Sequence, residues 1–116
     1  MLVNLSNHPF SKWSELQSNL AIETFRQVKD IPFPHINPNH SRAEVEELVT
    51  QYIEKILALR PMAVHVMGEF TFTFLLVTEL KKLNIPAIVS TTERIVSETD
   101  GKKVVTFNFV RFRHYF

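Results

Sequence analysis

The chain has 116 residues, and its 13 basic and 12 acidic side chains leave a formal charge of +1. This length favours one compact domain, residues 1–116, with a radius of gyration of about 13 Å, and the hydrophobic content of 45% argues against disorder. The absence of cysteine excludes disulfides, thiolate metal sites and cysteine nucleophiles, and the near-neutral charge argues against a protein that coats duplex DNA or an anionic membrane.

The first predicted elements are a strand and a helix. Leu2–Leu5 is apolar apart from one asparagine and predicts a short strand, which runs into the polar turn Ser6–Pro9. A helix follows. Ser11 can cap it if it begins near Lys12, and Ser14 offers a second capping position further on.

A second strand and a second helix come next. Val28–Ile31 predicts a weak strand, and three prolines then predict an irregular loop over Phe33–His40. Ser41 and Glu44 form the S-x-x-E pattern of a capping box, and apolar residues follow at helical spacing until Pro61 ends the helix.

The middle of the chain predicts a strand, a helix and another strand. Ala63–Met67 is a short apolar strand. The alternation from Phe70 to Phe74 has the period of a strand, but the residues after it continue with helical spacing, so we predict a helix that ends near Asn84. Ala87–Ser90 is the fourth predicted strand.

The C-terminal third predicts a hairpin. Thr91–Arg94 is expected to be a short polar link, followed by strands over Ile95–Thr99 and Lys103–Arg113. Asp100-Gly101 between them is typical of a type I′ turn. Strands that alternate with helices, followed by a hairpin, indicate a three-layer α/β domain with a mainly parallel sheet.

Several classes of protein are disfavoured by what the sequence lacks. Its only glycines, Gly68 and Gly101, cannot form a G-x-G-x-x-G motif or a P-loop. No segment approaches the roughly 20 apolar residues of a membrane span, and no signal peptide is evident, so a cytoplasmic location is expected. His35 and His40 have no partners at metal-ligand spacing, so no metal and no cofactor are expected.

Polar residues follow three of the predicted parallel strands. In open α/β sheets, ligands bind beyond the carboxyl ends of the strands, so these segments are the candidate binding site. The alternative is that such loops are polar simply because they are exposed. The candidate residues are Ser6, Asn7 and His8 after the first strand, Gly68, Glu69 and Thr71 after the third, and Ser90, Thr91, Thr92, Glu93 and Arg94 after the fourth.

Each charged candidate has a functional and a structural interpretation. The imidazole of His8 has an ordinary pKa of about 6.5 and could act as an acid or base, or it could merely belong to a turn. Arg94 could bind a phosphate or be solvated. Glu69 could bind a ligand or only favour the helix that follows it. His65 lies in an apolar strand and is expected to be a hydrogen-bonded core or interface residue.

The C-terminal segment Phe107–Phe116 is both aromatic and basic. Such a mixture could bind single-stranded RNA by stacking and phosphate contacts. The alternative is a strand whose Phe107 and Phe109 face the core, while Arg111 and Arg113 extend into solvent. The aromatic content exceeds what a small sheet edge should expose, so we expect a homodimer or a larger symmetric assembly.

The N-terminal residues carry a likeness to a known family. Leu2–Pro9, followed by Trp13 and Gln17 in the first helix, resembles the small Csx-type accessory proteins of type III CRISPR systems, which share a reduced, CARF-like Rossmann fold. Gly68-Glu69 before a helix and Ser90–Thr92 at a strand end agree with that family in outline. The specific likeness ends at Gln17.

This resemblance implies a function in antiviral signalling. Such proteins bind a cyclic oligoadenylate, here expected to be cyclic tetra-adenylate, across a homodimer cleft, and several are metal-independent ring nucleases. A ribose 2′-hydroxyl attacks the adjacent phosphate and leaves a 2′,3′-cyclic phosphate. The resemblance implies that Ser6, Asn7 and His8 contact phosphate or ribose, with His8 as acid or base. A non-catalytic sensor or interaction module and a single-strand RNA binder are the alternatives.

Overall fold

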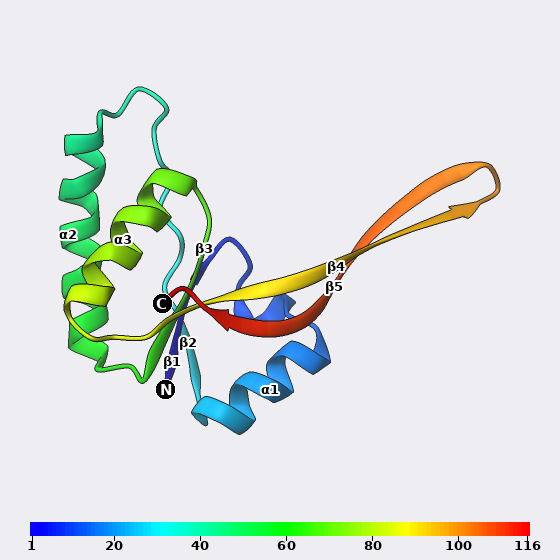
Figure 1. Ribbon diagram of the computed structural model, residues 1–116, viewed down its shortest axis with the longest axis horizontal. Coiled ribbons are helices and arrows are strands. Elements are labelled where there is room, and N and C mark those ends of the chain that lie inside the picture. The colour runs from blue at the N-terminus through cyan, green and yellow to red at the C-terminus, as the bar shows by residue number, and fades with distance from the viewer.

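The computed structural model describes residues 1–116 and contains five strands, three α-helices and a short 3-10 helix (Figure 1). In chain order these elements are β1 (Leu2–Ser6), η1 (Phe10–Lys12), α1 (Glu15–Phe25), β2 (Val28–Asp30), α2 (Arg42–Leu59), β3 (Ala63–Met67), α3 (Phe70–Lys82), β4 (Ala87–Thr99) and β5 (Lys102–His114).

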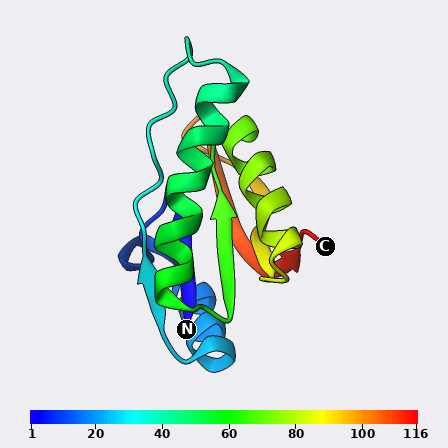
Figure 2. The same ribbon diagram turned by 90° about the vertical axis from the view of Figure 1, so that its left-hand side faces the viewer.

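All five strands form one sheet in the order β2-β1-β3-β4-β5. The first four are parallel, and β5 pairs antiparallel with β4. Helices α2 and α3 cover one face and α1 covers the other, as Figures 1 and 2 show. The predicted three-layer α/β fold with a mainly parallel sheet is therefore confirmed, and it is consistent with a Rossmann-like arrangement.

The two faces of the sheet carry apolar cores of different size. The larger core lies under α2 and α3, where β1 and β3 contribute Val3, Leu5, Val64 and Val66. The smaller core lies under α1 and holds four buried residues, Leu2, Ala21, Ala63 and Ile88. No helix of the chain is long and apolar enough to span a membrane.

The helix boundaries follow local capping chemistry. Ser14 caps α1 and accepts a hydrogen bond from the Gln17 amide, whereas Ser11 lies within η1. The predicted start of this helix near Lys12 is therefore wrong, and the predicted cap at Ser14 is confirmed. The capping box of Ser41 and Glu44 is present at α2 as predicted.

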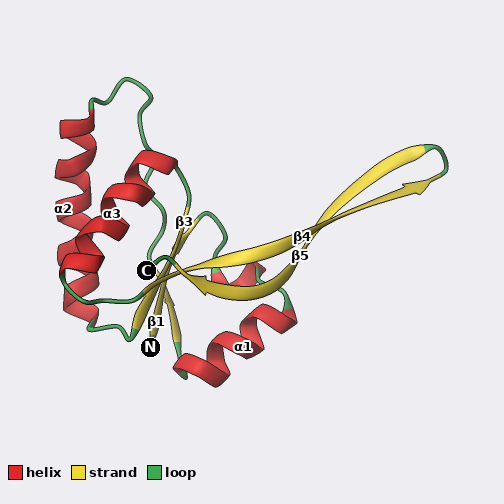
Figure 3. Cartoon of the chain, in the orientation of Figure 1, coloured by secondary structure: helices red, strands yellow, loops and turns green.

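The C-terminal hairpin differs from the prediction. Thr91–Arg94 is not a link, because these residues pair with β5 and make β4 one continuous strand (Figure 3). The pairing of β4 with β5 has a bulge where the register shifts between Thr91 and Thr92. The predicted turn is confirmed, since Asp100 and Gly101 both have positive φ. The outer part of the hairpin projects away from the body (Figure 1). It raises the radius of gyration to 15.7 Å, above the expected value of about 13 Å.

Candidate functional site

A pocket of about 650 Å³ opens on the α1 side of the sheet, where β1 and β3 end and β4 passes into the projecting hairpin. This place is the switch point of the topology, because the chain crosses from β2 on one side of β1 to β3 on the other. The pocket is lined by Ser6, His8, Lys12, Trp13, Ser14, Gln17, His65, Met67, Ser90, Thr92, Phe107 and Phe109.

The pocket exists because the α1 face of the sheet changes from apolar to polar along its strands. In register, Leu2 pairs with Ala63, and two residues further on Asn4 pairs with His65. On β4 the same face passes from Ile88, which pairs with His65 in register and belongs to the apolar cluster of Leu2 and Ala63, to Ser90, whose hydroxyl reaches His65. Alternation along each strand thus places apolar residues under α1 and polar residues at the carboxyl ends.

A hydrogen-bonded network forms the floor of the pocket. His65 Nδ1 lies 2.9 Å from Asn4 Oδ1, and His65 Nε2 lies 2.7 Å from Ser90 Oγ. Gln17 Nε2 donates to Ser90 Oγ at 2.9 Å, and Ser6 Oγ donates to Asn4 Oδ1 at 2.8 Å. The network therefore joins β1, β3, β4 and α1 through their side chains.

His65 is buried at the centre of this network. Its ring packs edge-on against Trp13 and Phe112, at centroid distances of 5.2 and 5.7 Å. Burial, together with the nearby His8, lowers the pKa of His65 to about 4. The imidazole is therefore neutral at pH 7. The prediction that His65 is a satisfied core histidine is confirmed, and the residue also lines the pocket.

The turn after β1 holds the His8 side chain at the rim. The His8 carbonyl accepts hydrogen bonds from Asn4 Nδ2 at 2.9 Å and from Trp13 Nε1 at 3.0 Å. The backbone amide of His8 donates to Ser6 Oγ at 3.3 Å. Because the backbone supplies all these contacts, the exposed imidazole is left available to a ligand.

The structure brings four of the predicted site residues together in this pocket. They are Ser6, His8, Ser90 and Thr92. Asn7 lies outside it, in a neighbouring hollow that Glu69 also lines. The three-loop cleft expected from the sequence is therefore only partly assembled.

The remaining predicted residues have structural contacts of their own. Glu69 caps α3 by accepting the amides of Thr71 and Phe72, which is the structural alternative considered for it. Gly68 lies against the ring of Phe33. Neither Gly68 nor Thr71 lines the pocket.

The prediction of a loop after the fourth strand was wrong, and the residues assigned to that loop lie on a strand instead. Because β4 continues as a strand, Ser90 and Thr92 face the pocket while Thr91 does not. Thr91 Oγ1 instead bonds the backbone of Arg111 beside the bulge. Glu93 and Arg94 lie on the projecting hairpin, opposite Asn108 and Phe107, and are exposed.

Sequence reasoning missed the polar network. Asn4 was absent from the candidates, and His65 was expected to be a core or interface residue and not part of a site. The available signal was a polar residue inside each of two short apolar strands. The chain contains no group of three His, Asp or Glu side chains that could hold a metal ion.

Fold and pocket together define an α/β protein with an open, mainly parallel sheet and a polar pocket at its switch point. The chain belongs to the uncharacterized protein MJ1673 family, whose family model matches residues 1–113. Neither the curated proteins nor the solved structures contain a significant match to it. The family description names no activity, so the likeness to CRISPR accessory proteins stays a prediction.

Proposed function

We propose that this protein is a CARF-like ring nuclease that binds and cleaves a cyclic oligoadenylate in antiviral signalling by type III CRISPR systems. The observation that carries the proposal is the pocket at the switch point, which gathers Ser6, His8 and Ser90 beside Trp13. Ser6 and His8 belong to the turn on which the family resemblance rests. The residues that carry the resemblance therefore line a pocket in which a ligand could contact them.

The pocket walls suit a nucleotide. Its volume falls within the range of roughly 300–1,000 Å³ that small-ligand sites occupy. Trp13 and Phe107 offer aromatic surfaces on which an adenine can stack, and Lys12 supplies a cation for a phosphate. One such pocket can take only part of a ring of four nucleotides, so a whole ring fits best between two pockets.

The proposed reaction is an in-line transfer at phosphorus. The 2′-oxygen of one ribose forms a bond to the adjacent phosphorus while the bond from phosphorus to the 5′-oxygen breaks. The products are a 2′,3′-cyclic phosphate and a 5′-hydroxyl. The 2′-hydroxyl loses a proton and the leaving oxygen gains one, and His8 at the rim is placed to supply the latter. Orientation and charge stabilisation supply most of the rate.

The proposal includes a homodimer, and the projecting hairpin supports it. A monomer of 13.5 kDa typically exposes about 6,500 Å², whereas this chain exposes 7780 Å². The excess of about 1,300 Å² is more than the roughly 800 Å² that each partner buries in a standard interface. An isolated two-stranded hairpin is marginally stable in water, so a second copy is the cover that we propose.

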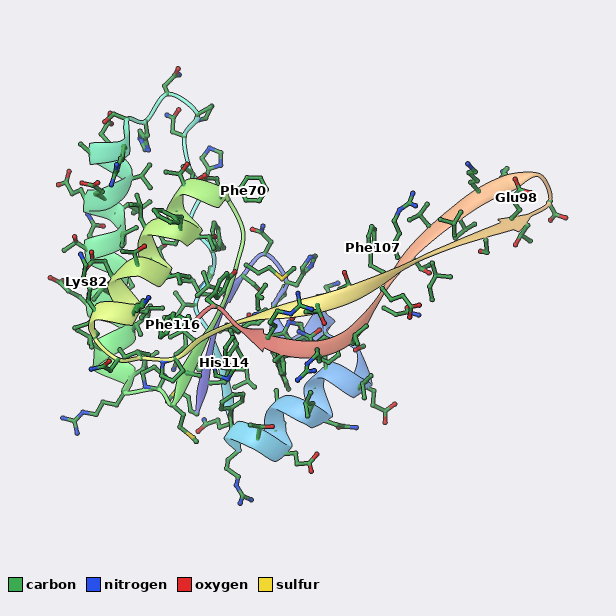
Figure 4. The ribbon with its side chains drawn as sticks, in the orientation of Figure 1. Phe70, Lys82, Glu98, Phe107, His114 and Phe116 are labelled. Atoms are coloured by element: carbon green, nitrogen blue, oxygen red, sulfur yellow. The ribbon has the colours of Figure 1, made fainter.

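One face of the hairpin continues directly from the pocket. Strand alternation and the β4–β5 register place Arg94 opposite Phe107, and Val96 opposite Val105, on the face that carries Thr92 and Phe109. Phe107 is 65% exposed and lies out along the hairpin, whereas Phe116 lies beside the body (Figure 4). The prediction that both Phe107 and Phe109 face the core was therefore wrong for Phe107. We propose that a second copy covers this face and closes the pocket.

Thermal shift with three probes tests the proposal at the level of binding. The protein is mixed with cyclic tri-, tetra- or hexa-adenylate, and the same rings are tested with Trp13→Ala. We expect one ring to raise the melting temperature of the wild type and to raise that of the variant less. A shift without cleavage would indicate the sensor alternative. Binding of linear RNA alone, weakened steeply by salt, would indicate the RNA-binding alternative.

A further inference from the structure

The direction of the hydrogen bonds across the pocket floor is fixed by Asn4. Its Nδ2 lies 2.8 Å from Asp30 Oδ1 and 2.9 Å from the His8 carbonyl oxygen. Both partners only accept, so the amide has one orientation, and its Oδ1 faces Ser6 and His65. The proton positions of His65 and Ser90 follow from this orientation.

The tautomer of His65 and the hydroxyl of Ser90 are set next. Asn4 Oδ1 can only accept, so His65 carries its proton on Nδ1, 2.9 Å away. His65 Nε2 is then a bare acceptor, and Ser90 Oγ, 2.7 Å from it, must donate its single proton there. Gln17 Nε2 donates to the same oxygen at 2.9 Å.

The two serines of the floor consequently offer the pocket lone pairs and no protons. The Ser90 hydroxyl points its proton at His65 Nε2 and keeps one lone pair free. The Ser6 hydroxyl donates within the turn, to Asn4 Oδ1 at 2.8 Å or the His8 carbonyl oxygen at 3.1 Å, and it accepts the His8 amide at 3.3 Å. A phosphate oxygen can only accept, so it cannot form a hydrogen bond with these serine oxygens. A hydroxyl or an amino group can donate one to them.

We propose that Ser90 accepts the proton of the attacking 2′-hydroxyl and passes its own proton to His65. This inference rests on the proposed function and assigns the base of that reaction. As the 2′-oxygen bonds to phosphorus, its proton moves to Ser90 Oγ and the Ser90 proton moves to His65 Nε2. The 5′-oxygen leaves with a proton from His8 or water, and the imidazolium of His65 later returns its proton to solvent through Ser90.

Burial explains why the path runs through Ser90. His65 is 2% exposed and lies between the rings of Trp13 and Phe112, so its main polar route to the pocket is Ser90. Of these two residues only Ser90 touches substrate, and His65 acts through it, as a positioning residue that takes up the Ser90 proton. The lowered pKa of His65 keeps the ring neutral at pH 7, so Nε2 holds a free lone pair toward Ser90, and the same shift makes the ring a weaker base than a free imidazole. His8 and Lys12 are the other titratable groups that line the pocket, and Asp30 lies behind Asn4.

Single-turnover cleavage of cyclic tetra-adenylate, or of whichever ring the wild type cleaves, tests the assignment. Ser90→Ala should lower the rate at least 100-fold, the scale of lost acid–base catalysis, and should change the dissociation constant of the intact ring by less than about fivefold. Ser90→Thr keeps the hydroxyl and should recover most of the rate. Thr50→Ala, an exposed hydroxyl on α2, is the control and should match the wild type.

The outcomes separate this inference from the proposed function. If the Ser90→Ala variant cleaves the ring at the wild-type rate, the proton path is wrong, and the proposed ring nuclease activity is unaffected. A wild-type protein that forms no product with any ring would overturn both. Nitrogen-15 NMR of the free protein adds a readout without substrate, because two-bond couplings report the tautomer of His65. The proton on Nδ1 is expected, and a proton on Nε2 would overturn the inference.

Discussion

The ring of Phe33 occupies the space that a side chain at Gly68 would need. A Cβ built on Gly68 would lie 2.3 Å from Cε2 and Cζ of Phe33. The same ring packs edge-on against Phe72 in the larger core, at a centroid distance of 5.2 Å. Gly68 therefore lets the loop before α2 close over the end of β3.

Gly68→Ala should destabilise the protein by about 1–3 kcal/mol, because the ring of Phe33 must move away from the core. Urea unfolding measures this change. Adding Phe33→Ala removes the clash, so Gly68→Ala should cost much less in that background. Equal costs in the two backgrounds would contradict this explanation of the glycine.

The sequence was sufficient to predict the parts of the fold that depend on local chemistry. The capping box at Ser41 and the turn at Asp100-Gly101 are each specified by residues close together in the chain. Strand and helix order then followed from periodicity. The class of fold and the switch point could be inferred from that order alone.

The predictions that failed concern features that depend on pairing between residues far apart in the chain. Thr91–Arg94 is polar, as a loop would be, and it becomes strand only because β5 supplies partners for it. The network around His65 likewise depends on the register of β1, β3 and β4. Local sequence does not specify such registers, so Ser90 was placed near the site without its partner being recognised.

Acid should destabilise the protein through His65. Its pKa is about 4 in the folded protein and about 6.5 when unfolded, so the unfolded chain binds the extra proton between these values. Stability from this group is present above pH 6.5 and is lost as the pH falls toward 4, amounting to about 3 kcal/mol. Urea unfolding from pH 7.5 to 4.5 measures the slope.

The variant His65→Gln is the control for that slope. Glutamine does not titrate, so the variant should lose less stability than the wild type over the same pH range, whatever its stability at pH 7. A parallel pH dependence in the two proteins would show that other groups cause the acid sensitivity.

His8→Ala should lower ring cleavage about 100-fold or more without unfolding the protein. The turn is held by the carbonyl and amide of His8, which alanine retains, and the side chain is exposed. Single-turnover rates and melting temperatures are the measurements. A variant with a wild-type rate would remove His8 from the mechanism.

Val96→Glu should convert the dimer into a monomer, because it places a charge in the apolar strip beside Val105. Ser97→Glu is a matched control, since the neighbouring residue of the same strand faces the other way. Sedimentation velocity distinguishes the two variants. A wild-type monomer at micromolar concentration, or equal effects of both substitutions, would contradict the proposed interface.

The most direct test of the ring nuclease is to identify its products. Cyclic tri-, tetra- and hexa-adenylate are each incubated with the protein, with and without a chelator, and analysed by chromatography and mass spectrometry. The account predicts that one ring, expected to be the tetra-adenylate, gives linear products with a 2′,3′-cyclic phosphate and a 5′-hydroxyl. Rings that remain intact, or products that end in a 5′-phosphate, would contradict it.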